Sequence, residues 1–190
     1  MPNVPAGRRT LAPAHPARTD RNRTATNGPR CTIPAYHPEM DSLTSAVAAV
    51  VTDPGGRVLL CQQSQGHRLW GLPSGRIQRC EHPAHAVTRD LQAATGLHVD
   101  VVDLVGLYRL TGPADDADGP LPDVVVHVFR ARIVGGEASV NAPDMIRRIG
   151  WYDPVDLPEP RTPTVRRVLA DATAGRSGVV ADVHRHAAPA

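Results

Sequence analysis

The feature of this sequence that most constrains its fold is a segment of regular spacing at residues 75–97, GRIQRCEHPAHAVTRDLQAATGL. Its second half predicts a helix over residues 83–95, because Pro83 suits the first helical turn and Gly96 suits the left-handed residue that ends a helix. Glu81, just before the helix, suits the positive end of the helix dipole. The segment therefore predicts a loop that leads into a helix with defined ends.

One face of this helix is apolar, since Val87, Leu91 and Ala94 recur at spacings of four and three. A valine-rich run and a second apolar run flank an Asp-Pro-Gly-Gly sequence and predict two strands around a turn. The order of strands, helix, strands and helix predicts an α/β fold in which helices pack on a mixed sheet. The predicted strands lie at residues 45–52, 57–62, 99–110, 124–133 and 146–152, with a short extended piece at 69–73 and a closing helix at 164–174.

The chain divides into one domain and two tails by composition. Residues 1–40 are rich in proline and arginine and poor in bulky apolar side chains, which predicts a disordered tail. Its excess of arginine is open to two interpretations, a solvated tail or a segment that touches anionic partners, and we favour the first. Residues 41–176 are expected to form the domain, and residues 177–190 a loose C-terminal tail. A chain of 190 residues is long enough for one domain with a core.

Bulk composition limits the function. A net charge of +2 gives no strong nucleic-acid signal. The cysteines Cys31, Cys61 and Cys80 are odd in number and unpaired in spacing, so they form no zinc or redox motif and favour a reducing, cytoplasmic location. No apolar run approaches the ~18–20 residues of a membrane span, so we expect no membrane partner.

The segment at residues 75–97 resembles the Nudix box, whose pattern is Gly, five residues, Glu, seven residues, Arg-Glu, an apolar residue, any residue, Glu-Glu, any residue, Gly and an apolar residue. The flanking sequences Leu69-Trp70-Gly71-Leu72-Pro73 and Trp151-Tyr152-Asp153 also resemble the family, and the resemblance covers roughly residues 44–175. It implies a Nudix-type α/β/α sandwich with a mixed β-sheet. It also implies cleavage of a diphosphate attached to another group, very often a nucleoside.

The glutamates of the family's box hold magnesium, which neutralises phosphate charge and activates water. The three central positions read Asp90, Ala93 and Ala94 here, and alanine has no atom that binds a cation. The resemblance therefore carries catalytic roles to Glu81, Arg89 and Asp90 only. Asp90 and Glu81 remain as weak metal ligands, so a magnesium cofactor is possible but the lost glutamates argue against it.

Several other residues have both a functional and a structural interpretation. Arg147 and Arg148 belong to the stretch at residues 144–148, which matches a late loop of the family. Arginine there can grip a phosphate or simply face solvent on a strand, and both interpretations stay open. For Glu81 with Arg89 we favour an ion pair over a catalytic role. Solvated or structural roles are also favoured for the other polar candidates, which are His82, His85, Cys80, Asp144, and Asp115, Asp116 and Asp118 of the loop at residues 111–122.

Three functional hypotheses follow. The first is a Nudix-superfamily protein with a compromised metal site that binds a nucleotide-like or other phosphorylated small molecule without efficient hydrolysis. The second is a metal-dependent Nudix hydrolase that cleaves a nucleoside diphosphate-type substrate. The third is a recruited, metal-free enzyme that acts on a small metabolite through His85, Asp90 or Cys80. In each case the expected partner is a small molecule, and a homodimer remains one possible assembly.

Overall fold

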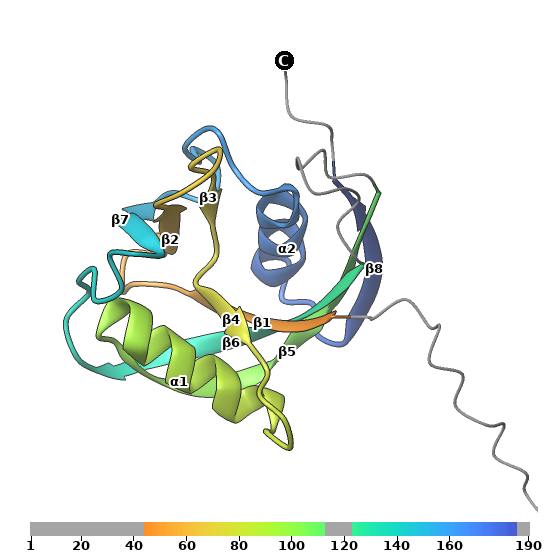
Figure 1. Cartoon of the computed structure of the whole chain (residues 1–190), viewed down its shortest axis with the longest axis horizontal. Coiled ribbons are helices and arrows are strands. Elements are labelled where there is room, and N and C mark those ends of the chain that lie inside the picture. The colour runs from red at the N-terminus through yellow and green to blue at the C-terminus, as the bar shows by residue number, and fades with distance from the viewer. Residues whose placement is uncertain (1–43, 113–122, 186–190) are drawn as a thin grey trace, which may run out of the picture. The chain divides into compact units, whose positions relative to one another are not determined.

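A computed structural model describes residues 44–112 and 123–185 of the chain (Figure 1). The elements in chain order are β1 (Thr44–Val51), β2 (Val58–Gln63), β3 (Trp70–Gly71), β4 (Ser74–Arg76), α1 (Pro83–Thr95), β5 (His98–Thr111), β6 (Val124–Gly135), β7 (Ile146–Tyr152), α2 (Pro163–Thr173) and β8 (Val179–His184). Among these residues, no helix is long and apolar enough to cross a membrane.

The strands form two sheets. The larger has five strands in the order β4-β1-β6-β5-β8, and the smaller has three in the order β3-β2-β7. The larger sheet is mixed, because β1 runs parallel to β6 and β8 parallel to β5, whereas β5 and β6 are antiparallel. The predicted α/β fold with a mixed sheet is therefore confirmed.

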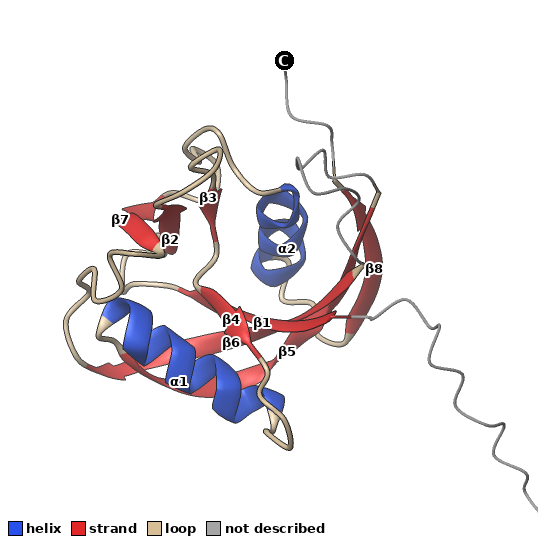
Figure 2. Ribbon diagram, in the orientation of Figure 1, coloured by secondary structure: helices blue, strands red, loops and turns tan. Residues whose placement is uncertain are grey.

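The core lies on both faces of the larger sheet. Residues of a strand point alternately to opposite faces. In β1, Val47 and Ala49 join the cluster that contains Val87 and Leu91 of α1, whereas Ala48 joins the cluster that contains α2. Figure 2 accordingly shows the two helices on either side of this sheet. The predicted sandwich of helix, sheet and helix follows directly from this alternation.

One local feature differs from the sequence prediction. The predicted pair of strands around a turn exists, but β1 and β2 lie in different sheets. Asp53 stabilises the turn between them, since its carboxylate accepts hydrogen bonds from the backbone N–H groups of Gly55 and Arg57 at 2.9 and 2.8 Å. The predicted tail at residues 1–40 and most of the predicted loop at 111–122 lie outside the described residues.

The C-terminal boundary was predicted too early. Residues 177–190 were expected to be a loose tail, but β8 pairs with β5 from Gly106 opposite Val179 to Thr111 opposite His184. Val183 is buried and packs in the same cluster as α2. This short strand is stabilised by burial against an element distant in sequence, so its own composition did not reveal it.

The close approach of β5 and β8 gives a testable requirement for Gly106. A Cβ at this position would lie 2.4 Å from the carbonyl oxygen of Val179, which is backbone and cannot swing away. We expect Gly106→Ala to lower the free energy of unfolding by about 1–2 kcal/mol through overpacking and to raise hydrogen exchange in β8. Urea denaturation and exchange mass spectrometry measure both effects.

The matched control is Gly135→Ala, because the nearest atom to its added Cβ is His98 Cβ at 3.9 Å. Equal stability of the two variants would show that β8 does not depend on the close contact at Gly106.

Candidate functional site

Helix α1 begins and ends at the predicted residues. His82 is its N-cap, where Nδ1 accepts a hydrogen bond from the backbone N–H of Ala84 at 3.2 Å. Gly96 adopts the left-handed conformation at φ 73° and donates its N–H to the carbonyl of Gln92 at 2.8 Å. Glu81, expected at the positive end of the helix dipole, instead accepts a hydrogen bond from the backbone N–H of Gln78 at 2.9 Å. The helix therefore relies on His82 as its cap, and Glu81 serves the preceding loop.

Glu81, Arg89 and Asp90 form an ion-pair cluster, called here the box clamp. The Arg89 guanidinium contacts both carboxylates, with Nη2 2.8 Å from Asp90 Oδ1. It also donates to the carbonyl of Arg76 at 2.9 Å, while Asp90 Oδ2 accepts from the Arg76 N–H at 3.0 Å. The expected Glu81–Arg89 ion pair is confirmed. These contacts tie the loop before α1 to the helix, so the clamp has a structural function.

The electrostatics of the clamp keep Glu81 and Arg89 charged. The backbone N–H of Gln78, together with the guanidinium of Arg89, holds the pKa of Glu81 below its ordinary value. Hydrogen bonds to Glu81 and Asp90 raise the pKa of Arg89. Gly75 makes room for the cluster, because a Cβ there would lie 1.7 Å from Asp90 Oδ2. The first residue of the segment at 75–97 is therefore a glycine for steric reasons.

A cavity of about 720 Å³ lies beside the clamp. Its size is in the range of small-molecule binding sites. Part of its wall comes from α1, where Ala93 and Ala94 line it together with Arg89 and Asp90, and apolar side chains form much of the rest. These apolar lining residues include Ala46, Ala48, Leu72, Leu110, Val126, Val128, Ala142, Met145 and Ile146. The cavity suits a ligand with a substantial apolar surface.

The residues present do not fit the magnesium site that the resemblance implies. Magnesium needs carboxylate oxygens in near-octahedral array. Ala93 and Ala94 offer none, and both oxygens of Asp90 already accept hydrogen bonds from Arg89 and Arg76. Glu81 is engaged in the same way. Within residues 44–112 and 123–185, no group of three or more His, Cys, Asp or Glu side chains could hold a metal ion.

The cavity carries positive charge through Arg76, which the sequence analysis missed. Arg76 lies opposite Ala46 in the β4–β1 pairing, and Ser74 lies opposite Ala48. Paired residues of neighbouring strands share a face, so both side chains lie on the face where Ala46 and Ala48 line the cavity. The guanidinium of Arg76 makes no hydrogen bond or ion pair with the described part of the chain. The sequence shows that Arg76 follows Gly75, but the face of the sheet on which its side chain lies depends on the pairing of β4 with β1.

Other candidate residues lie apart from the cavity. Arg147 and Arg148 are exposed on β7 and do not line it, although Met145 and Ile146 do. Their role in binding stays a prediction that this placement does not support. The backbone carbonyl of Asp144 accepts a hydrogen bond from the Ser64 hydroxyl.

The cysteine and histidine candidates have no catalytic arrangement. Cys61 lines the cavity, but burial raises the pKa of its thiol to about 12, so the reactive thiolate is absent near neutral pH. Cys80 is exposed. The rings of His82 and His85 lie 5.6 Å apart between centroids, outside the cavity lining. Cys31, Asp115, Asp116 and Asp118 lie outside the described residues.

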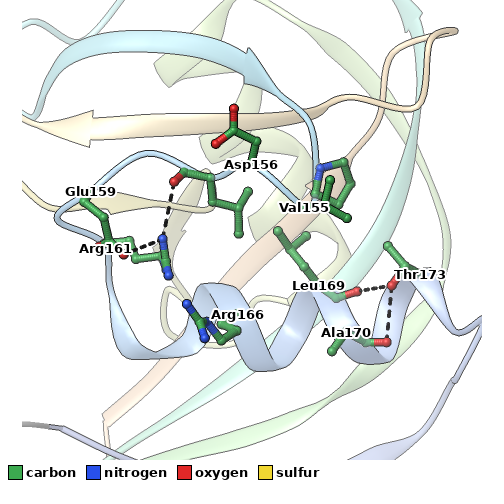
Figure 3. A pocket seen from close by; sticks show the side chains of 10 residues that line it. Val155, Asp156, Glu159, Arg161, Arg166, Leu169, Ala170 and Thr173 are labelled. Carbon is green, nitrogen blue, oxygen red and sulfur yellow. Dashed lines mark hydrogen bonds and ion pairs between the residues drawn. The ribbon is translucent and has the colours of Figure 1, made fainter.

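A second hollow of about 690 Å³ lies between α2 and the segment before it (Figure 3). Arg161 and Arg166 reach into this region, but Arg161 is paired with Glu159 at 2.7 Å and donates to the carbonyl of Leu157 at 3.4 Å. Asp156 also lines the hollow, so its charges are mixed. None of the segment at residues 75–97 contributes to it. The cavity beside the clamp is therefore the better candidate site.

Comparison with known proteins agrees with this fold. The chain belongs to the Nudix family, because the family model for the NUDIX domain matches residues 42–172. It is 28% identical over 141 residues to a MutT-like protein of Streptomyces ambofaciens, covering 74% of this chain and 82% of the relative. It is 24% identical to a Bacillus subtilis (strain 168) protein provisionally assigned as an 8-oxo-dGTP diphosphatase, covering 72% of this chain and 84% of the relative.

A solved structure shows the same architecture. The MutT NUDIX hydrolase from Burkholderia pseudomallei superposes with a TM-score of 0.60 at 28% identity, over 67% of this chain and 96% of that chain. The region that the family model matches, residues 42–172, includes the box clamp and the residues that line the cavity.

Proposed function

We propose that this protein binds a nucleotide-like or other phosphorylated small molecule in the cavity beside the clamp, without efficient hydrolysis of its diphosphate. One observation carries the proposal. At two of the three positions where the family pattern has a carboxylate, Ala93 and Ala94 line the cavity with side chains that have no oxygen atom. At the third, both carboxylate oxygens of Asp90 accept hydrogen bonds within the clamp. A site without free carboxylates cannot assemble the ions that activate water in metal-assisted hydrolysis.

The second candidate function is metal-dependent hydrolysis of a nucleoside diphosphate-type substrate. The relatives favour it, since the names of the Bacillus subtilis and Burkholderia pseudomallei proteins describe a diphosphatase and a hydrolase. These names support hydrolysis of phosphorylated substrates in the family. Loss of that step in this chain is our own inference from residues 90, 93 and 94. The third hypothesis, a metal-free enzyme, gains no support from His85 and Cys80, which lie outside the cavity lining. Its third candidate, Asp90, lines the cavity but accepts hydrogen bonds from Arg76 and Arg89.

Restoring the glutamates tests the proposal. We expect the wild-type protein to release no phosphate or pyrophosphate above background from a panel of nucleoside diphosphate derivatives with magnesium or manganese. The Ala93→Glu/Ala94→Glu variant places two carboxylates in the cavity and is expected to bind magnesium and to hydrolyse at least one compound of the panel. Phosphate release and magnesium titration by calorimetry provide the two measurements.

The matched control is Gln92→Glu, which adds a carboxylate to an exposed position of α1 that does not line the cavity. This variant should remain inactive. Wild-type turnover of about 1 per second or faster, an ordinary enzymatic rate, would contradict the proposal and favour the second candidate function.

A further inference from the structure

We propose that the guanidinium of Arg76 takes the place of the family's metal ions, so that this protein binds a diphosphate group without a divalent cation. The inference rests on the proposed function, because it concerns the same cavity and the same class of ligand. It goes further by naming the residue that holds the anionic end of the ligand and by making binding independent of metal.

The position of Arg76 is the first support. β4 is one of the two edge strands of the larger sheet, and its register with β1 puts Arg76 on the face of the sheet that lines the cavity. The backbone of Arg76 is fixed at both polar atoms, since its N–H donates to Asp90 and its carbonyl accepts from Arg89. The clamp therefore holds the backbone of this residue in place while leaving its side chain free to contact a ligand.

The balance of charge is the second support. Arg89 and Asp90 both line the cavity and are paired with each other, and Arg89 is also paired with Glu81, which does not line it. The charge that remains in the lining is the guanidinium of Arg76, which has no partner within the described residues. This positive charge repels a magnesium ion and attracts a phosphate. Arginine also suits the phosphate group geometrically, because its planar fork donates two parallel hydrogen bonds.

The neighbouring side chains complete a site for such a ligand. Ser74 lies on the same face of β4 as Arg76 and lines the cavity with a hydroxyl group. Thr162 and Thr164 contribute further hydroxyl groups, whose oxygens lie 3.2 Å apart. Apolar residues such as Val126 and Val128 form another part of the lining. A ligand with a diphosphate near Arg76 and a less polar body over the apolar lining matches this distribution.

Calorimetric titration of the full chain with ADP, pyrophosphate and adenosine tests the inference, each with excess EDTA and with magnesium. We expect ADP to bind in EDTA, with a dissociation constant within about threefold of that in magnesium, and adenosine to bind more weakly by about tenfold or more. Arg76→Gln should weaken ADP binding about tenfold to a hundredfold, the usual range for a lost charge-assisted hydrogen bond, without changing adenosine binding. Arg76→Lys keeps the charge and should retain part of the affinity.

Arg79→Gln is the matched control, since Arg79 is also exposed and unpaired within the described residues but does not line the cavity. It should bind ADP like the wild type, and thermal unfolding should confirm that both glutamine variants are folded. ADP binding that requires magnesium, or that survives Arg76→Gln unchanged, overturns this inference and leaves the proposed function standing. If no phosphorylated probe binds in either condition, the proposed function fails as well.

Discussion

The Asp171→Asn variant is expected to lose about 2–4 kcal/mol of unfolding free energy, because it removes the charge from a buried network of ion pairs and hydrogen bonds. Asp171 lies in α2 and is 1% exposed. Its carboxylate accepts hydrogen bonds from Arg167 and Arg176, each at 2.9 Å, and from the hydroxyl of Tyr108 at 3.1 Å. Tyr108 is fully buried in β5, so this network fastens α2 to the larger sheet.

The loss is expected to depend on pH. Burial by itself raises the pKa of Asp171, but the hydrogen bonds from Arg167 and Tyr108 and the charge of Arg167 outweigh it and hold the pKa below its ordinary value. A carboxyl whose pKa is lowered by folding stabilises the protein above its unfolded pKa, about 3.9 for aspartate. That contribution is lost as the pH falls through the lower, folded pKa. The difference in unfolding free energy between the wild type and Asp171→Asn should therefore be largest at neutral pH and should decrease as the pH falls.

Urea denaturation at neutral pH and at a series of acidic values measures this difference. Tyr108→Phe is the control, because it keeps the buried ring and removes one hydrogen bond, for a cost of about 1 kcal/mol. A stability difference for Asp171→Asn that stays constant down to the most acidic pH would show that its charge does not stabilise the fold.

Removal of the guanidinium from the box clamp has the second large expected effect. Arg89→Met should lower the free energy of unfolding, because two carboxylates, Glu81 and Asp90, lose the guanidinium that pairs with both of them. The side chains of these two acids are only 17% and 24% exposed, so water compensates them in part. The carbonyl of Arg76 also loses its hydrogen bond. We therefore expect the loop before α1 to loosen.

Thermal unfolding and hydrogen exchange of residues 76–82 measure the two consequences. Arg79→Met is the matched control from the same loop, because Arg79 has no hydrogen bond or ion pair with the described residues. Acidification should narrow the gap between Arg89→Met and wild type, since protonation of Glu81 removes the repulsion that the variant creates. If Arg89→Met and Arg79→Met unfold at the same temperature, the clamp does not contribute to stability.

The elements predicted well from the sequence are those determined by local signals. Pro83 and Gly96 delimit α1 through their backbone preferences, and the strand predicted at residues 146–152 has the observed bounds of β7. The elements that were missed depend on distant contacts. β8 exists because it pairs with β5, and Arg76 belongs to the cavity because β4 pairs with β1. Neither pairing leaves a pattern in the residues themselves.

The candidate site divides in the same way. The spacing of Glu81 and Arg89 in the segment at residues 75–97 predicted their ion pair. The sequence could not show that both carboxylate oxygens of Asp90 accept hydrogen bonds, from Arg76 and from Arg89. The bond from Arg76 depends on how the segment before α1 packs against the helix. The binding role predicted for Arg147 and Arg148 relied on proximity in sequence to the late loop, and their exposure on β7 does not support it.

Within the segment at residues 75–97, the residues that maintain the fold are different from those that determine the chemistry of the cavity. Glu81, Arg89 and Asp90 hold the loop, whereas the side chains of Ala93 and Ala94 face the cavity and make no polar contact. Alanine is also the strongest helix former, so exchange at these two positions carries little risk to folding. Evolution can therefore remove or replace the reactive groups while the scaffold persists, and protein engineers can use the same two positions to install new ones.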